Sequence, residues 1–393
     1  MMLNETWIAL ILCLVALGVT ALVFPYVLRY AKKHNLVDNP NYRKLQRVPV
    51  PVIGGTAVFI GFAVALSVAT IVFHLRYMGV GLAATGLMWL LGTWDDLKDI
   101  PANLRFIIEI VVLWALITLG QTSIDDFHGL WGIHAVSPYI SIPISILTGV
   151  GLLNAINMID GVDGYCSGFG MLSSLLFAVL FFAAGDVPAG CFALICAGSL
   201  LPFFLHNVFG KRTKMFIGDG GSLMIGMLMT LFVYRVMVSG SLCDRFYVEQ
   251  GMGLAAFTLA VLCIPVADTL RVMSARILKG KSPFSPDKTH LHHLFIEMGF
   301  THVATSLSIL LMDLVIVAVW LLSWKLGASV DVQLYVVILM GLLVCFGFYF
   351  YMESQRAKNS ALWQRFCKLG ALTRSKGARF RVRMRRLVDG PKR

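Results

Sequence analysis

The chain has 393 residues, of which 58% are hydrophobic and only 14% are charged, and its formal net charge is +12. A soluble domain carries roughly 25% charged residues, so this composition excludes an ordinary soluble protein. Apolar runs of about 20 residues, the length that a membrane-crossing helix needs, recur along nearly the whole chain. We therefore expect an all-α polytopic membrane protein.

Eleven apolar runs predict about 11 transmembrane helices, which begin near residues 7, 52, 79, 103, 140, 166, 187, 220, 251, 303 and 333. An odd number of spans places the two ends of the chain on opposite sides. Of the 33 lysines and arginines, 29 fall in segments that follow odd-numbered spans. The positive-inside rule therefore predicts that the N-terminus is outside and the C-terminus is cytoplasmic.

The first polar cluster, DDLKD, ends the third span and contains Asp95, Asp96 and Asp99. Neighbouring carboxylates repel one another unless cations or protons intervene. Acidic residues at a helix terminus would be an ordinary structural explanation. Their position just beyond a span, in a chain with only 21 acidic residues, favours a functional role.

The second cluster, NAINMIDGVDG, contains Asn154, Asn157, Asp160 and Asp163. The spacing of the first three places their side chains on one face of a helix. Such side chains are costly against lipid, so they are expected to face protein or a water-filled cavity. A turn between spans explains the glycines of this motif but not its row of oxygen-bearing side chains.

The third cluster, KMFIGDGGS, places Lys214 and Asp219 just before the eighth span. A helix N-cap is the simple explanation. The same geometry offers a carboxylate for Mg²⁺ and free backbone N–H groups for phosphate. The glycines match no P-loop, so ATP binding is not expected.

The fourth cluster follows the ninth span, in which Asp268 and Arg271 are spaced to pair on one helix face, as structural glue or as part of a site. The stretch KSPFSPDKTHLHH, residues 281–293, then supplies His290, His292 and His293. No cysteine lies nearby, and the surrounding carboxylates favour a hard cation such as Mg²⁺ over zinc. The histidines suit hydrogen bonding or proton transfer to phosphate oxygens.

These clusters, with Lys44 beside the first span, supply carboxylates for a cation and basic groups for phosphates. That inventory suits phosphoryl transfer at the cytoplasmic membrane surface, with one lipid-borne substrate. A secondary transporter is the alternative from another class. It would need polar residues near the bilayer midplane and typically internal repeats, and the sequence shows neither.

The C-terminal segment carries thirteen basic residues between Arg356 and Arg393, including the run RFRVRMRRL. Such a run suits an anionic lipid surface, to which each basic residue adds about 1 kcal/mol. Disorder is the other option, and nucleic acid is not expected as a partner. We divide the chain into an integral membrane domain, 1–352, and a basic cytoplasmic tail, 353–393.

The motifs DDLKD, NAINMIDGVDG, FIGDGGS and SPFSPDKTHLHH resemble, in the same order, signatures of the polyprenyl-phosphate N-acetylhexosamine-1-phosphate transferases. The resemblance covers at least residues 20–300. The last motif is closest to the undecaprenyl-phosphate N-acetylglucosaminyl-1-phosphate transferase branch, which starts O-antigen, enterobacterial common antigen or teichoic acid linkage units. The family's RK-x-H-x-x-P loop would place a histidine near Leu45 or Gln46, and this chain has none there.

The resemblance implies a UDP-N-acetylglucosamine donor, an undecaprenyl phosphate acceptor, Mg²⁺ or Mn²⁺, release of UMP, and a bacterial cytoplasmic (inner) membrane location. Another UDP-N-acetylamino sugar stays open as the donor, because no motif reports the hexose. The oligomeric state is also open, and a homodimer is one option. A direct in-line attack by the lipid phosphate is predicted, with a two-step aspartyl-phosphate route as the alternative.

The family's residue roles carry over to matching positions of this chain. They imply Asp219 as principal metal ligand with Asn157 beside it, Asp95 and Asp96 as the catalytic acidic pair, Asp160 and Asp163 on the nucleotide side, and His290, His292 and His293 on the pyrophosphate. We add four candidate ligand-binding residues, Asn154, Asp163, Lys44 and Arg271.

Overall fold

The computed structural model describes residues 2–39, 48–73, 76–283, 288–376 and 378–390. Its two short strands, β1 (Val37–Asp38) and β2 (Val50–Pro51), pair antiparallel. The helices are α1 (Met2–Lys33), α2 (Gly54–Phe73), α3 (Arg76–Lys98), α4 (Ala102–Gly120), η1 (Leu130–Gly132), α5 (Pro138–Met158), α6 (Tyr165–Ala184), α7 (Val187–Phe209), α8 (Gly218–Met237), α9 (Asp244–Gln250), α10 (Leu254–Val261), α11 (Cys263–Leu278), α12 (Leu291–Glu297), α13 (His302–Lys325), α14 (Val330–Gly341), η2 (Leu342–Phe348), α15 (Tyr349–Ala357), α16 (Ala361–Lys376) and α17 (Ala378–Asp389).

The prediction of an all-α polytopic membrane protein is confirmed. Within the described residues, nine helices are long and apolar enough to cross a membrane, and the bent pair α10–α11 would make a tenth. The 23-residue α3 is less apolar, but it packs against α2, α4 and α8 as a member of the same bundle. Each of the eleven predicted spans coincides with one of these helices or helix pairs.

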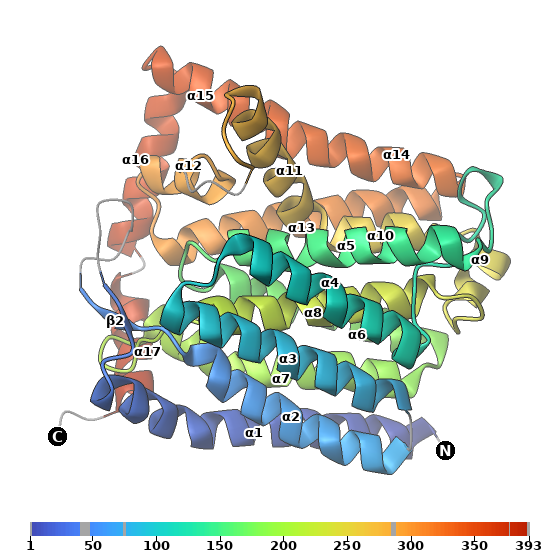
Figure 1. The fold of residues 1–393 in the computed structure, drawn as a ribbon. Helices are drawn as coiled ribbons and strands as arrows, with labels where there is room; N and C mark the ends of the chain where they lie inside the picture. Colours follow the sequence, from blue (N-terminus) through green and yellow to red (C-terminus); the bar gives the residue numbers. More distant parts are fainter. Residues whose placement is uncertain (1, 40–47, 74–75, 284–287, 377, 391–393) are drawn as a thin grey trace.

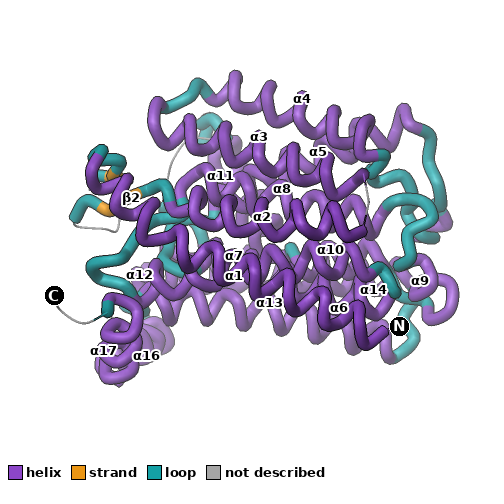
Figure 2. The backbone as a smooth tube through the Cα atoms, turned by 90° about the horizontal axis from the view of Figure 1, so that it is seen from below, coloured by secondary structure: helices purple, strands orange, loops and turns teal. Residues whose placement is uncertain are grey.

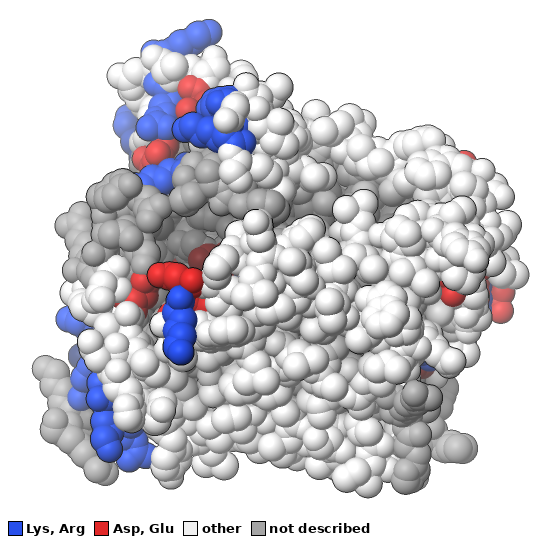
Figure 3. All heavy atoms as spheres, in the orientation of Figure 1, with Lys and Arg blue, Asp and Glu red and all other residues white. Residues whose placement is uncertain are grey.

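The long helices run side by side, and the two termini lie at opposite ends of the bundle (Figure 1). The long side seen in Figure 3 is almost free of charged side chains, as a lipid-facing surface requires. Acidic side chains gather in a hollow at one end, which is also the end crossed by α16 and α17. The assignment of this end to the cytoplasm remains a prediction from the charge pattern.

Helix α8 is the centre of the bundle and is buried along almost its whole length. Glycines allow its neighbours to approach closely, as is common between membrane helices. A Cβ atom on Gly92 of α3 would lie 2.2 Å from the Asp219 carbonyl oxygen, and one on Gly226 would lie 2.8 Å from the Leu153 Cα atom of α5. These contacts fix α8 and its first residues against α3 and α5.

The ninth predicted span is two helices, α10 and α11, which meet at a bend of 72°. Pro265 explains the break, because it has no N–H group to donate to the carbonyl of Val261, the last residue of α10. Beside the break, the buried Asp313 of α13 accepts a long hydrogen bond, 3.4 Å, from the backbone N–H of Ile264. Helix α11 then carries its polar residues toward the acidic hollow.

The predicted C-terminal tail begins inside α15 and continues as α16 and α17. Seen from a second direction, these two helices protrude at the same end of the bundle as β2 (Figure 2). They contact α7 and α15. The described residues of this segment are helical, whereas a disordered tail was one of the two expectations from the sequence.

Candidate active site

Segments far apart in the sequence meet at the acidic end of the bundle. They are the end of α3, the turn between α5 and α6, the start of α8, and the segment of α12. Figure 3 shows the acidic side chains of this end gathered in a hollow. The described parts of the four motifs that the sequence singled out therefore lie together at one end of the bundle.

Asp96 holds the first turn of α8. Its carboxylate accepts hydrogen bonds from the backbone N–H groups of Asp219, 3.0 Å, and Gly220, 3.1 Å. Gly218 precedes them with a φ of +71°, and a Cβ atom there would lie 2.2 Å from the Val52 carbonyl oxygen. Only glycine fits this left-handed, crowded position. Asp96 thus places the Asp219 side chain by capping its helix.

The loop before α8 is paired with the start of α2. The Phe216 N–H donates to the Pro51 carbonyl, 2.8 Å, and the first two N–H groups of α2 donate to the carbonyls of Phe216 and Ile217. The site is therefore fixed through backbone contacts to the segment that follows α1. Lys44, predicted as ligand-binding, lies outside the described residues.

Asp95 belongs to a network centred on Arg105 of α4. The guanidinium lies 3.1 Å from Asp95 Oδ2, 3.1 Å from Glu109 Oε1 and 3.5 Å from Asp219 Oδ2. Asn154 donates to Glu109 Oε2 at 2.9 Å. Our sequence reasoning missed Arg105 and Glu109, although opposite charges four residues apart at the start of an apolar span were an available signal.

Asp163 binds two basic side chains in the turn between α5 and α6. Its Oδ2 lies 2.6 Å from Lys214 Nζ and 3.0 Å from His302 Nδ1. Burial acts to raise the pKa of Asp163, but the hydrogen bonds and charges of His302 and Lys214 lower it below its usual value. Asp163 is therefore a fixed anion, and His302, the first residue of α13, is a further site residue that the motifs did not reveal.

Asp160, three residues earlier in the same turn, has no such cationic partner among the described residues. Burial, together with the negative charges of Asp219 and Asp163, raises the pKa of Asp160 to about 7. A carboxyl group in that environment gains from any cation that enters the cavity. The two aspartates of one motif thus have opposite electrostatic roles.

Asn207 near the end of α7 joins this turn to the next motif. Its side chain accepts from the Gly164 N–H at 2.7 Å and donates to the Met215 carbonyl at 2.9 Å. Nothing in its sequence neighbourhood marks it, since it lies in an apolar span with His206 as its neighbour. It was missed for that reason.

His290 is oriented by buried Asp268 of α11. Its Nδ1 lies 2.9 Å from Asp268 Oδ2, and Arg271 NH2 lies 2.6 Å from Asp268 Oδ1. The Arg271 guanidinium also stacks 3.6 Å from the centre of the Tyr349 ring and is almost fully buried. Arg271, predicted as ligand-binding, therefore lies behind His290 and braces it through Asp268, while lining neither polar cavity.

The other two histidines follow His290 in a row: His292 stacks on His290, and the His293 ring is tilted against His292. The His292 ring centre lies 5.5 Å from that of His290 and 4.4 Å from that of His293. Burial first, and the charges of the neighbouring histidines second, lower the pKa of His292 well below its usual value. His292 also packs on the turn of the second motif, where a Cβ atom on Gly161 would lie 2.4 Å from its Nε2.

Two polar cavities adjoin at Gly161 and His293. The first, of about 500 Å³, is lined by Asp96, Asp160, Asp163, Lys214, Asp219 and His302. The second, of about 600 Å³, is lined by Asp95, Arg105, Asn154, Asn157, His290 and His292. The described residues to which we assigned a catalytic, metal-binding or ligand-binding role all border one of these two cavities, except Arg271; Asp99 and Asp268 of the same clusters border neither.

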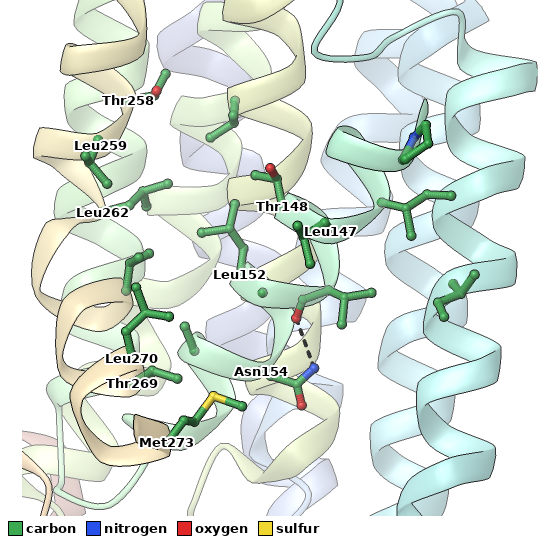
Figure 4. Close-up of a pocket in the computed structure, with 18 of the residues that line it drawn as sticks. Leu147, Thr148, Leu152, Asn154, Thr258, Leu259, Leu262, Thr269, Leu270 and Met273 are labelled. Carbon is green, nitrogen blue, oxygen red and sulfur yellow. Dashed lines mark hydrogen bonds between the residues drawn. The ribbon is translucent and has the colours of Figure 1, made fainter. Parts of the chain in front are cut away.

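An apolar cavity of about 800 Å³ opens beside the polar ones. Figure 4 shows Leu147 and Leu152 of α5 facing Leu259, Leu262 and Leu270 of the bent pair. Asn154 lines both this cavity and the second polar cavity. The site therefore joins an apolar groove to a polar pocket at Phe106 and Asn154.

The donors of the site suit a hard cation that also binds phosphate. Within the described residues, no three His, Cys, Asp or Glu side chains gather as a ready metal site. Asp160 and Asp219 line the same cavity, and the Asn157 side chain lies beside Asp219. Mg²⁺ commonly takes one or two carboxylates and fills its other positions with water and phosphate oxygens, whereas zinc needs three or four protein ligands.

An apolar groove beside cavities with acidic and basic side chains suits an enzyme that acts on one lipid and one phosphorylated, water-soluble substrate. Residues 78–237 match the sequence profile described as Glycosyl transferase family 4. The undecaprenyl-phosphate alpha-N-acetylglucosaminyl 1-phosphate transferases of Yersinia pestis and Escherichia coli K12 are 31% and 29% identical over 289 residues, which is 72% of this chain and 75% of each relative. The decaprenyl-phosphate N-acetylglucosaminephosphotransferase of Mycolicibacterium smegmatis is 30% identical over 74% of this chain and 77% of its own. The chain belongs to this family of polyprenyl-phosphate sugar-1-phosphate transferases.

Proposed function

We propose that the protein transfers N-acetylglucosamine-1-phosphate from UDP-N-acetylglucosamine to undecaprenyl phosphate and releases UMP. The observation that carries this proposal is the junction at Asn154, which borders both the apolar groove and a polar cavity. A polyprenyl chain would lie in the groove with its phosphate beside the polar groups. The names of the relatives support the same acceptor class and sugar.

The proposed step is a direct displacement. An oxygen of the lipid phosphate forms a bond to the β-phosphorus of the donor, and the bond from that phosphorus to the bridging oxygen breaks. UMP leaves with the electron pair of the broken bond. Such a reaction requires mainly positioning and neutralisation of charge on the phosphates.

Side chains of the two cavities divide these tasks. Lys214 and His302 would donate to phosphate oxygens of the donor from the Asp163 side. Asp95 lines the cavity that borders the groove, so it is the better placed of the acidic pair to accept a proton from the lipid phosphate. Asp96 is engaged by the backbone of α8 and serves to hold Asp219.

Mg²⁺ or Mn²⁺ is the cofactor that we propose. Asp219 and Asp160, with the side-chain oxygen of Asn157, would hold it beside the donor phosphates. The cation would supply positive charge to the pyrophosphate as negative charge moves onto UMP.

The test is UMP release by the purified, detergent-solubilised protein with undecaprenyl phosphate and a panel of UDP-sugars. We expect UDP-N-acetylglucosamine to be used best. Preference for another UDP-N-acetylamino sugar would change the donor but keep the reaction. Solute flux into proteoliposomes without UMP release from any donor would contradict the proposal and support a transporter.

A single-turnover experiment separates the two chemical routes. The direct route predicts that labelled donor leaves no phospho-sugar on the protein when undecaprenyl phosphate is omitted. A trapped phospho-sugar adduct that later transfers to lipid would establish the two-step route.

Replacement of Asp219 tests the proposed cation site. Asp219→Asn should lower kcat by at least about 100-fold, because one preorganised charge in a site of this kind is worth about that much. The control is Asp331→Asn at the opposite end of the bundle, where the carboxylate accepts only from the Trp131 N–H among the described hydrogen bonds. Full turnover by Asp219→Asn would show that the cation is held elsewhere.

The excess of basic residues at the acidic end supports an inner-membrane protein whose active site faces the cytoplasm. A reporter fused after the last residue should be active only as a cytoplasmic reporter, and one fused to the N-terminus only as a periplasmic one. The reverse pattern would refute this orientation.

A further inference from the structure

The C-terminal helices α16 and α17 lie across the end of the bundle that carries the polar cavities (Figures 1 and 2). They reach the two segments that carry Lys214 and His302. Lys214 and His302 are the two basic partners of Asp163. The contacts of each helix with its segment are specific and polar.

Helix α17 ends on the loop that precedes Lys214. The Asp389 carboxylate accepts hydrogen bonds from three consecutive backbone N–H groups, those of residues 211–213, at 3.1 to 3.3 Å, and from the Thr213 hydroxyl at 2.8 Å. Arg212 donates in return to the backbone carbonyls of Asp389 and Gly390, each at 3.1 Å. Consecutive N–H groups that converge on one carboxylate form an anion-binding nest.

The charge of Asp389 matches this nest. Partial burial acts to raise the pKa of Asp389, but the hydrogen bonds from Thr213 and the loop backbone lower it below its usual value. Asp389 is therefore an anion at every physiological pH. The residue after the nest is Lys214, whose Nζ lies 2.6 Å from Asp163 Oδ2.

Helix α16 packs in a similar way on the turn before His302. Thr373 accepts from the Thr301 N–H at 3.2 Å, and Arg374 donates to the Gly299 carbonyl at 3.1 Å. A Cβ atom on Gly370 would lie 2.3 Å from the Met298 carbonyl oxygen, so helix and turn are in direct contact. His302, which follows Thr301 in the chain, lies 3.0 Å from Asp163 Oδ2 through its Nδ1 atom.

The two helices act as one unit. Arg381 of α17 donates to the carbonyls of Thr373, 3.3 Å, and Arg374, 2.7 Å, near the end of α16. The Phe380 ring also meets Phe209, the last residue of α7, edge to face at 5.9 Å. A displacement of either helix would therefore be transmitted to the other.

We propose that α16 and α17 form part of the donor site, with Asp389 and Thr373 as positioning residues that hold Lys214 and His302 against Asp163. This role rests on the proposed function, because Lys214 and His302 line the cavity assigned to the UDP-sugar. It goes beyond that function in giving the basic tail a part in donor binding. A tail that served only as a membrane anchor would not need a carboxylate seated in the loop beside the pocket.

The first test compares Asp389→Ala with a matched control in the purified full-length protein. Asp389→Ala should raise KM for UDP-N-acetylglucosamine about tenfold, the loss expected for charge-assisted hydrogen bonds that preorganise a loop. Its kcat and its KM for undecaprenyl phosphate should change by less than about threefold. Glu353→Gln, on α15 with a partly exposed side chain and Arg356 as its partner, should leave all three unchanged. An unchanged donor KM in Asp389→Ala would overturn the proposal.

A double-mutant cycle distinguishes positioning from general stability. The dissociation constant of UDP-N-acetylglucosamine is measured by equilibrium dialysis, without turnover, for Asp389→Ala, Lys214→Ala and the double variant. If Asp389 acts through Lys214, the double variant should bind no more weakly than Lys214→Ala alone. Fully additive losses would contradict the proposed route.

Two further measurements cover the case in which Asp389→Ala folds poorly. Thr213→Val removes one contact from the same nest and should raise the donor KM by a smaller factor. Hydrogen exchange at the amides of residues 211–213 should accelerate in the Asp389 variant, while exchange in the turn at 159–164 stays slow. Equal acceleration in both segments would mean loss of the fold and would refute a positioning role. Absence of UMP release by the wild-type protein would instead defeat the proposed function itself.

Discussion

Asp160 and His292 are two buried groups whose pKa values shift in ways that affect stability oppositely. Folded Asp160 keeps a proton up to about pH 7, whereas the unfolded carboxyl loses it near 3.8. Its contribution to the free energy of unfolding therefore falls as the pH rises between these values. Folded His292 stays neutral where the unfolded imidazole binds a proton, so its contribution falls as the pH drops below about 6.5.

Variants of these two residues should separate the opposing effects. In metal-free detergent solution, His292→Asn should gain more stability than the wild type as the pH falls from 7.5 to 5.5, because the opposing response of His292 is absent. Asp160→Asn should gain less stability than the wild type over the same interval, because the stabilising protonation of Asp160 is absent. Thermal unfolding at several pH values measures both, and the wild type should lie between them. Identical pH dependence in all three proteins would contradict the opposite shifts.

Residues in dense polar motifs could be predicted from the sequence, and isolated ones could not. Asp95, Asp160 and His293 are marked by neighbours of the same kind between apolar spans. Asn207 has no such mark, because its role depends on the loop that the fold brings beside it. Arg271 is a mixed case: its spacing predicted the pair with Asp268, which forms at 2.6 Å, whereas its assignment as a ligand-binding residue stays a prediction and its guanidinium is buried against Tyr349.

At the scale of single elements, the first turn of α8 depends on a glycine with a left-handed backbone. A Cβ atom on Gly218 would meet both the Val52 carbonyl and, at 2.4 Å, the Asp96 carboxylate. Gly218→Ala should therefore cost at least about 1–2 kcal/mol from backbone strain alone, and it should displace Asp219. We expect a lower unfolding temperature together with a loss of kcat.

Gly18→Ala is the matched control for this prediction. No atom of the described residues lies within 4 Å of a Cβ atom built on Gly18, which is in the middle of α1. Alanine favours a helix interior by roughly 0.8–1 kcal/mol over glycine, so this variant should be as stable as the wild type or slightly more stable. If Gly218→Ala and Gly18→Ala had the same unfolding temperature and the same kcat, the crowding at Gly218 would have no effect on stability or activity.

The elements themselves followed from the hydropathy pattern, but the bend in the ninth span did not. A straight helix and a broken helix can have the same apolar sequence pattern. Pro265 indicates that a bend is possible but does not predict its angle. The bend matters because it directs Asp268, and through it His290, toward the site. The C-terminal helices likewise cover the acidic end of the bundle through the contacts of Asp389. Those contacts could not be predicted from the hydropathy pattern of the sequence.

At the scale of the whole molecule, the apolar groove and the polar cavities should bind the two substrates independently. Gly151 lines the groove, and a Cβ atom there would lie more than 4 Å from every atom in the described part of the chain. Gly151→Trp should therefore fill the groove and raise KM for undecaprenyl phosphate at least about tenfold, while the donor KM stays constant. Leu22→Trp on the exposed face of α1 is the control. A parallel rise in both KM values would contradict separate sites.

The position of Asn154, at the junction of groove and pocket, also sets how the acceptor is delivered. A phosphate that reaches the pocket while its chain stays in the groove never has to leave the bilayer. The acceptor then arrives by two-dimensional diffusion, and its effective concentration is its mole fraction among the surrounding lipids. Addition of inert detergent at constant total acceptor should therefore slow turnover, although the bulk ratio of substrate to enzyme is unchanged.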